Sequence, residues 1–211
     1  MFEDRSHAGI ALGARLSEFA PPNPLVLALP RGGVPVGYQV ARALACDLDV
    51  LLVRKLGVPG QPELAMGAVA EGGVVIRNQA IIDLAGVDQA AFEAVLRVEA
   101  GTLARRASDY RADHPPIDPA GHTALIVDDG LATGATALAA IEALRMRDTV
   151  GVWLCVPVGP PDTVRAMGDV ADRVVVLDQP RHFGAVGAWY RDFGQTDDAQ
   201  VRSLLARSRL R

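Results

Sequence analysis

Long hydrophobic runs are absent from this sequence of 211 residues, although half of its residues are hydrophobic. No stretch approaches the roughly 18 consecutive apolar residues that a membrane-spanning helix needs. The first 20 residues carry acids early and lack a long apolar block, which excludes a secretory signal. We therefore expect a soluble, cytoplasmic protein without a membrane partner. Its length suits one hydrophobic core, so we expect a single domain over residues 1–211.

Lysine and cysteine are also scarce. Lys55 is the only lysine among 21 basic residues, and the other 20 are arginines. These basic residues are interspersed with 25 acidic ones, giving a formal net charge of -4. No basic stripe is available to neutralise a phosphate backbone, which argues against nucleic acid as the main partner. Cys46 and Cys155 each lie in an apolar segment outside any CxxC pair, so we expect reduced core thiols.

The hydrophobic residues that are present form short runs rich in valine, leucine and isoleucine, and most of these runs precede a helical pattern. Runs that are apolar on both faces suit buried parallel strands. The alternation predicts an α/β fold, an open and mostly parallel sheet with helices on both faces and a core at about residues 24–178. The predicted strands are 24–30, 48–54, 122–129, 149–158 and 172–178, and the predicted helices are about 34–45, 133–146 and 161–169.

Two segments break this alternation. Residues 57–73, "GVPGQPELAMGAVAEGG", are rich in glycine and proline, which favours a mobile loop or a short hairpin over a packed helix. Residues 88–112 predict one long helix, because their apolar residues lie close to one helical face. The prolines of the turn at 113–122 then end this helix.

The stretch "ALIVDDGLATGAT", residues 124–136, carries the most chemical information. Asp128 and Asp129 follow an apolar strand, and ligands of open α/β sheets bind at the carboxyl ends of strands. The loop at 130–136 then enters a helix, whose first backbone N–H groups can hold a phosphate. The two carboxylates would repel that phosphate unless they faced sugar hydroxyls or a hydrated magnesium ion. The stretch therefore predicts a sugar-phosphate site, although an acidic helix cap remains the simpler structural alternative for one aspartate.

The same stretch resembles the phosphoribosyl pyrophosphate (PRPP) signature of type I phosphoribosyltransferases. The resemblance covers roughly residues 25–178 and is closest to bacterial members whose acceptor is unassigned. It implies that Asp128 and Asp129 bind the ribose 2- and 3-hydroxyls, directly or through Mg²⁺, and that the following loop holds the 5-phosphate. The loop residues are Gly130, Leu131, Ala132, Thr133, Gly134, Ala135 and Thr136.

Two further segments resemble the pyrophosphate-binding parts of the family. "LPRGGVPVG" follows the first predicted strand, and it places Arg31, Gly32 and Gly33 where the family turns backbone N–H groups toward the diphosphate. Arg54 and Lys55 end the second predicted strand, where the family has a basic residue. An ordinary turn and two solvent-exposed basic residues are the structural alternatives.

The resemblance also identifies two segments that would cover the active site. Residues 57–73 take the place of the family's flexible catalytic loop, in which Glu63 or Glu71 could act on the acceptor's proton. Residues 179–211 take the place of its hood, or acceptor element. Four of the ten aromatic residues lie between 181 and 194, with Phe183 and Asp192 as candidates for binding the acceptor. A core or dimer-interface cluster is the alternative reading, and a homodimer is expected by resemblance alone.

The resemblance thus implies an enzyme that transfers 5-phosphoribosyl from Mg²⁺-PRPP to a nitrogen nucleophile, a base or an amine, and releases pyrophosphate. Ala132 stands where members acting on 6-oxopurines have an aspartate, which disfavours hypoxanthine and guanine and leaves the acceptor open. A regulatory protein that binds PRPP or a nucleotide without transfer is the alternative function. A dinucleotide-binding redox enzyme is disfavoured because no GxGxxG fingerprint is present.

Overall fold

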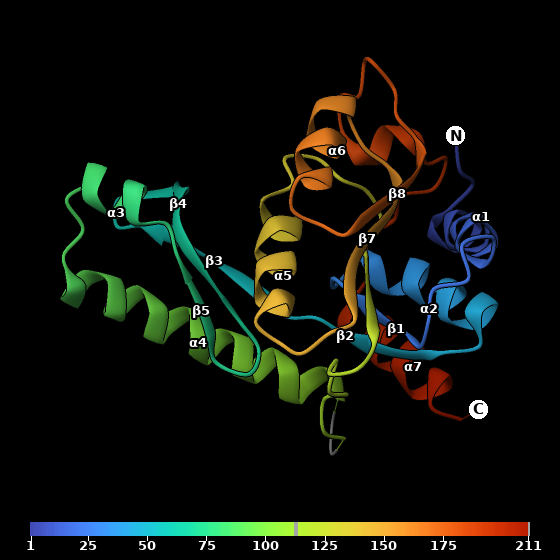
Figure 1. The fold of residues 1–211 in the computed structure, drawn as a ribbon, viewed down its shortest axis with the longest axis horizontal. Coiled ribbons are helices and arrows are strands. Elements are labelled where there is room, and N and C mark those ends of the chain that lie inside the picture. The colour runs from blue at the N-terminus through green and yellow to red at the C-terminus, as the bar shows by residue number, and fades with distance from the viewer. Residues whose placement is uncertain (112–113, 211) are drawn as a thin grey trace.

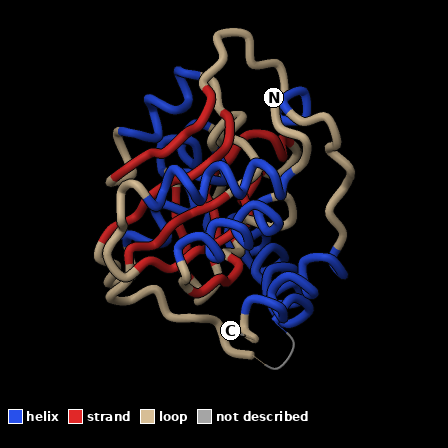
Figure 2. The backbone as a smooth tube through the Cα atoms, turned by 90° about the vertical axis from the view of Figure 1, so that its right-hand side faces the viewer, coloured by secondary structure: helices blue, strands red, loops and turns tan. Residues whose placement is uncertain are grey.

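The computed structural model describes residues 1–111 and 114–210 and contains a parallel sheet of five strands in the order β2-β1-β6-β7-β8. Each neighbouring pair in this sheet is parallel, as expected for runs that are buried on both faces. The strands lie near the centre of the molecule (Figure 2). Their bounds are β1 Pro24–Ala28, β2 Asp47–Val50, β6 Thr123–Val127, β7 Gly151–Val158 and β8 Arg173–Asp178.

Helices cover both faces of this sheet, which confirms the predicted fold class (Figure 1). One face packs against α1 (Arg5–Ser17), α2 (Gly33–Leu44) and α7 (Asp198–Ser208), with a core that includes Leu12, Val36 and Leu205. The opposite face packs against α5 (Ala135–Arg145) and α6 (Pro161–Gly168), with a core that includes Ile141 and Met167. Alternate residues of each central strand enter the two cores; Leu125 faces the first and Ile126 the second.

A second, antiparallel sheet forms a hood beside α5, in the strand order β3-β4-β5. Its strands are β3 (Val53–Val58), β4 (Gln61–Ala70) and β5 (Val74–Arg77). The short helix α3 (Gln79–Leu84) and the long helix α4 (Gln89–Arg111) follow the sheet in sequence and lie on the side away from α1 (Figure 1). The predicted helix at 88–112 is thus confirmed as far as Arg111, and Ala112 lies outside the described residues.

This hood sheet corrects the prediction of one strand at 48–54. The chain leaves the parallel sheet after Val50 and begins β3 at Val53, so the single apolar run supplies strands to two different sheets. Of the two alternatives predicted for residues 57–73, a hairpin is present. β4 pairs with β3 on one side and with β5 on the other, with register shifts at Leu56–Gly57 and Gly57–Val58. Flexibility of this segment stays a prediction.

Residues near the N-terminus contact the segment that precedes α7. Phe2 forms an isolated parallel bridge with Tyr190, and their rings lie 5.5 Å apart. Phe2 and Tyr190 belong to a small cluster with Ala8 and Val158, packed near the carboxyl ends of the parallel strands. Residues 183–194 are mostly irregular, with one 3-10 turn, η1 (Val186–Trp189). No described helix is both long enough and apolar enough to cross a membrane.

Candidate functional site

The two aspartates of the 124–136 stretch lie where β6 ends, and the glycine pair that follows β1 packs directly against them. The two strands are adjacent and parallel, so their carboxyl ends share one edge of the sheet. A Cβ atom at Gly32 would overlap the carboxylate of Asp129. One at Gly33 would lie 2.5 Å from the carbonyl oxygen of Val127 and 2.9 Å from Cα of Asp128. The paired glycines are therefore required by the close approach of the two loops.

The loop at 130–136 has the form of an anion cradle. Gly134, the N-cap of α5, has φ 78°, a conformation that favours glycine, and it makes no side-chain cap hydrogen bond. The first N–H groups of α5 consequently depend on a ligand or solvent for partners. Leu131 is anchored in the core and its N–H donates to the Val158 carbonyl at 2.8 Å, which fixes the base of the loop. Thr133 and Thr136 are exposed, so their hydroxyls are accessible.

A cleft of about 140 Å³ lies between the cradle and Asp128, the first of the two acids. Asp128 lines the cleft together with the loop residues from Gly130 to Thr136. Its Oδ1 accepts a hydrogen bond from the backbone N–H of Asp129 at 2.8 Å. The first acid therefore faces the space beside the cradle, which is the arrangement a sugar carrying a terminal phosphate requires.

Asp129 is held by Arg5 near the N-terminus and by Tyr190 in the C-terminal segment. Arg5 Nε donates to Asp129 Oδ2 at 2.7 Å, and the two side chains are only 13% and 15% exposed. The hydroxyl of Tyr190 donates to the Asp129 carbonyl oxygen at 2.5 Å. Arg5 also donates to the carbonyl oxygen of Gly194 and stacks on the ring of Phe193. The second acid thus has a fixed orientation and a paired charge.

The electrostatics of the acid pair follow from this packing. Burial, and then the adjacent charge of Asp129, raise the pKa of Asp128 well above its usual range, while Arg5 acts in the opposite direction. Burial, followed by the charge of Asp129, likewise raises the pKa of Tyr190, so its hydroxyl remains a hydrogen-bond donor across the neutral range. A cation bound between the two carboxylates would favour their charged forms.

Magnesium fits the acid pair as a metal shared with a ligand. Carboxylate oxygens are the ligands it prefers, and it is usually held by one or two of them together with waters and substrate phosphates. Asp128 and Asp129 each commit one oxygen to the hydrogen bonds above, and each has one other oxygen. Among the described residues, no cluster of three or more histidine, cysteine or acidic side chains could bind a metal without a ligand's help.

The basic residues predicted near the diphosphate lie in different parts of the fold. Arg31 is at the loop after β1, with its side chain 40% exposed and its nearest acid, Asp198, 4.0 Å away. Arg54 and Lys55 do not end a strand of the parallel sheet, because both belong to β3 of the hood. Arg54 donates to Glu99 of α4 at 2.6 Å.

Lys55 nevertheless lies across a groove from the loop at 130–136. Its Nζ lies 3.2 Å from Glu63, whose side chain is almost fully exposed. The groove has a volume of about 520 Å³ and separates the hood sheet from α5. Lys55 and Arg77 line it from the hood, and Thr133, Thr136 and Glu142 line it from the loop and from α5. The other predicted loop acid, Glu71, instead bonds the buried Arg111.

The two acceptor candidates lie in the C-terminal segment but are not adjacent to each other. Phe183 packs in the aromatic cluster, and its carbonyl oxygen accepts from Trp189 Nε1 at 3.0 Å. Asp192 is exposed and accepts from the N–H of Gly194 at 2.9 Å. It borders a polar cleft of about 250 Å³, which Arg5 also lines. Both residues remain predictions as acceptor ligands.

Arg5, Tyr190 and Glu99 are the site residues that sequence reasoning missed. The pairing of Arg5 with Asp129 joins residues 124 positions apart, and nothing in either local pattern announces it. The helix that carries Arg5 did leave a signal, because Asp4 caps it and its buried residues Ala8, Leu12 and Leu16 recur every fourth position.

Comparison with known proteins gives a consistent result. "Putative phosphoribosyl transferase Rv0571c" and "Putative phosphoribosyl transferase MT0597", from two strains of Mycobacterium tuberculosis, H37Rv and CDC 1551 / Oshkosh, are each 47% identical to this chain over 208 residues. The match covers 99% of this chain and 47% of each relative, so the chain spans about half the length of the curated relatives it matches.

A solved structure extends the likeness to the whole described fold. The crystal structure of TT1426 from Thermus thermophilus superposes with a TM-score of 0.90 at 40% identity and covers 98% of both chains. The model of the phosphoribosyl transferase domain matches residues 7–185, which include Gly32, Gly33, Asp128, Asp129 and the loop at 130–136. On this match, and on the relatives that share almost its full length, the chain belongs to the phosphoribosyl transferase domain family.

Proposed function

We propose that this protein is a phosphoribosyltransferase that uses Mg²⁺-PRPP as donor and transfers the 5-phosphoribosyl group to a nitrogen nucleophile. The observation that supports it most directly is the contact between Gly32–Gly33 and Asp128–Asp129, beside the cradle at 130–136. One edge of the sheet thereby brings together a helix N-terminus without a side-chain cap, two carboxylates and a glycine-rich loop. A phosphoribosyl donor has groups to match: a 5-phosphate, two ring hydroxyls and a diphosphate.

In the proposed reaction, the bond between ribose C1 and the diphosphate oxygen breaks, and pyrophosphate leaves with the electron pair. The acceptor nitrogen forms the new bond to C1 and gives up its proton. Arg31, exposed beside the glycine pair, would neutralise charge on the leaving diphosphate. The backbone amides at 130–136 would hold the 5-phosphate, while Asp128 and Asp129 would accept hydrogen bonds from the ribose. Magnesium, when bound, would draw further charge from the diphosphate.

The acceptor is proposed to be a base or an amine that approaches from one of two sides, the C-terminal segment or the groove beside the hood sheet. Phe183 would supply an aromatic face and Asp192 a proton acceptor, as predicted from the sequence. The groove lined by Lys55 and Thr136 is the second approach, and its volume of about 520 Å³ suits a small-molecule ligand. Substituting Asp192→Asn and Glu142→Gln separately, then comparing acceptor KM, would distinguish the two approaches.

Calorimetric titration with PRPP, with and without Mg²⁺, tests the donor site. The wild type should bind PRPP more tightly with the metal, and the double variant Asp128→Asn, Asp129→Asn should lose that binding. Pyrophosphate release in the presence of a panel of bases and amines then tests transfer. Absence of any PRPP binding by the wild type would overturn the proposal.

A second function is a regulatory protein that binds PRPP or a nucleotide without transfer. The ion pairs of the hood favour it, because Arg54 is paired with Glu99 and Lys55 with Glu63, so an acid already offsets each basic charge. PRPP binding that needs Asp128 and Asp129, together with no pyrophosphate release for any acceptor tested, would support this function over the enzyme.

A further inference from the structure

Arg5 is held at the acid pair by three contacts from two separate parts of the chain, the end of β6 and residues 193–194. Its Nε donates to Asp129 Oδ2 at 2.7 Å, and its Nη1 donates to the Gly194 carbonyl oxygen at 2.7 Å. Its Cζ lies 3.8 Å from the centroid of the Phe193 ring, a distance typical of a stacked guanidinium. A planar group with two directional hydrogen bonds and a stacking surface has little freedom to turn.

This geometry determines what Asp129 can offer a ligand. Arg5 occupies Oδ2 on one side, and the backbone at Gly32 packs against the same carboxylate, so that even a Cβ there would overlap it. The Tyr190 hydroxyl fixes the main chain of the same residue through its carbonyl oxygen. Oδ2 is thus committed to Arg5, which leaves Oδ1, beside the Asp128 side chain, as the oxygen that Asp129 can offer a ligand, in a direction set before the ligand arrives.

We infer that Arg5 is a positioning residue of the donor site, which holds Asp129 so that Oδ1 accepts a hydrogen bond from one ribose hydroxyl. This role rests on the proposed function of the site. It assigns to α1, an element outside the predicted core at 24–178, part of the discrimination between ribose and deoxyribose. The positive charge of Arg5 also offsets the repulsion between two adjacent carboxylates at the position where a phosphorylated sugar must enter.

A latch that blocks the site is the opposite role for the same contact. A latch has to leave when the ligand binds, and its release should therefore tighten binding. The stacking on Phe193 and the hydrogen bond to Gly194 favour a permanent brace, because both would have to break together with the ion pair to Asp129, whose two side chains are little exposed. The two roles predict changes of opposite sign in affinity.

The test compares the affinities of ribose 5-phosphate, 2-deoxyribose 5-phosphate and 3-deoxyribose 5-phosphate, measured by calorimetry. The wild type should prefer ribose 5-phosphate over at least one deoxy sugar by roughly tenfold or more, as expected for a hydroxyl bound to a charged acceptor. Arg5→Gln should reduce that preference to less than about threefold while leaving the affinity for the same deoxy sugar within about twofold. Arg5→Lys, which keeps the charge without the planar fork, should retain an intermediate preference.

Arg15→Gln is the matched control, because Arg15 lies on the same helix and its side chain is 49% exposed in a pair with Glu18. It should behave as the wild type. Phe193→Leu removes the stacking surface and leaves Arg5 and Asp129 in place, so it should weaken the preference less than Arg5→Gln does. Thermal unfolding of each variant verifies that it is folded at the temperature of the titration.

The outcomes separate this inference from the function on which it rests. No binding of any of the three sugar phosphates by the wild type would overturn the proposed donor site itself. Wild-type binding with an unchanged ribose preference in Arg5→Gln would overturn the role of Arg5 alone. Tighter binding of all three sugars by Arg5→Gln would identify a latch instead of a brace, and an equal loss for all three would indicate a structural role.

Discussion

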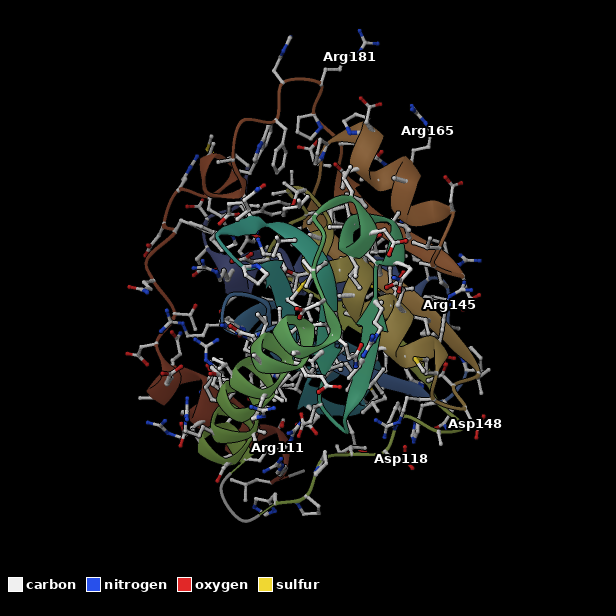
Figure 3. The ribbon with its side chains drawn as sticks, turned by 90° about the vertical axis from the view of Figure 1, so that its left-hand side faces the viewer. Arg111, Asp118, Arg145, Asp148, Arg165 and Arg181 are labelled. Atoms are coloured by element: carbon white, nitrogen blue, oxygen red, sulfur yellow. The ribbon has the colours of Figure 1, made fainter. Side chains whose placement is uncertain are left out.

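Arg111 lies almost fully buried at the end of α4, where one side chain joins three parts of the fold (Figure 3). Its Nε donates to both carboxylate oxygens of Asp49, at 2.8 and 3.0 Å, and its Nη2 donates to the carbonyl oxygen of Val50. Its Nη1 bonds Glu71, just beyond β4. Burial would lower the pKa of Arg111, but the hydrogen bonds with Glu71 and Asp49 outweigh that effect and raise it. The cluster therefore connects the parallel sheet with the hood.

Removing this guanidinium should be costly. Arg111→Ala leaves Asp49, which is 1% exposed, as an unpaired charge, and we expect the free energy of unfolding to fall by about 3–5 kcal/mol. Urea denaturation measures the change. The control is Arg145→Ala, because Arg145 and Asp172 form a half-exposed pair 3.5 Å apart, and its loss should cost under about 1 kcal/mol. Equal effects for the two variants would refute this assignment.

Tyr110 should make the protein less stable in alkali. Burial, and then its hydrogen bond to Asp198, raise its pKa to about 12 from the ordinary 10.0. The unfolded chain therefore releases this proton at a lower pH than the folded protein does, so stability is fully present below pH 10 and falls as the pH rises from about 10 to 12. Urea midpoints across this range measure the loss, which should be smaller in Tyr110→Phe. An identical pH dependence in the variant would assign the loss to other groups.

The position of Gly32 and Gly33 in the fold could be predicted from the sequence, but their packing could not. The sequence marks them as a glycine pair after a strand, and this placed them correctly at the same sheet edge as the two aspartates. Their packing against those aspartates could not be read from the sequence, because it depends on how close two loops approach after the sheet has formed. Arg5 was concealed for the same reason, since its partner is distant in the chain.

The predicted elements were most accurate for strands that are buried on both faces of the sheet. The strands at 24–30, 122–129, 149–158 and 172–178 are all present within a few residues, because a strand covered on both faces leaves a continuous apolar run. The run at 48–54 has the same composition, yet the chain changes sheets within it. The hydrophobic pattern predicts that Leu51 and Leu52 are buried, as they are, but it cannot predict where the chain passes from one sheet to the other.

The hood sheet gives a sharp test at the level of packing. Gly67 of β4 faces the carbonyl oxygen of Ile76 so closely that a Cβ would overlap it. We expect Gly67→Ala to destabilise the hood by about 1–3 kcal/mol, by forcing β4 and β5 apart. Hydrogen exchange should show faster exchange in β3–β5 than in the parallel sheet. Retention of wild-type protection in these strands would mean that the sheet accommodates the methyl group without separating.

Gly101 is the contrasting case in the neighbouring helix. It lies inside α4, and a Cβ there would meet no atom within 4 Å. Alanine in a helix interior is favoured over glycine by about 0.5–1 kcal/mol, so Gly101→Ala should raise the free energy of unfolding by that amount. Thermal or urea unfolding measures the gain. A loss of stability would show that α4 needs a flexible residue at this point.

Donor binding should be visible in the stability of the entire protein. A ligand that binds only the folded state at 100 times its Kd adds about 2.7 kcal/mol to the free energy of unfolding. We expect PRPP with Mg²⁺ to raise the thermal midpoint of the wild type, and to leave the Asp128→Asn, Asp129→Asn variant unchanged. A similar rise in both proteins would indicate that the ligand binds elsewhere.

The fold class could be predicted from the sequence, but not every element of the fold. The alternation of strands and helices was enough to predict a parallel sheet with helices on both faces, and the family match covers most of that sheet. Two elements were not fully predicted: the helix at residues 5–17, although its buried residues recur every fourth position, and the antiparallel hood, for which a short hairpin was one of two alternatives. How each packs against the rest of the fold depends on contacts between segments far apart in the sequence.

The meeting of residues 2–5 with residues 189–194 over Asp129 also has a consequence for how the protein is made. Asp129 and its phosphate loop leave the ribosome well before Tyr190, Phe193 and Gly194, which hold it and Arg5 in place. A nascent chain that ends within α6 therefore contains Asp128 and Asp129 but lacks Tyr190, Phe193 and Gly194. The proposed ribose site therefore needs the chain through Gly194, and we expect chains shortened before that point to lack the ribose preference proposed for the full chain.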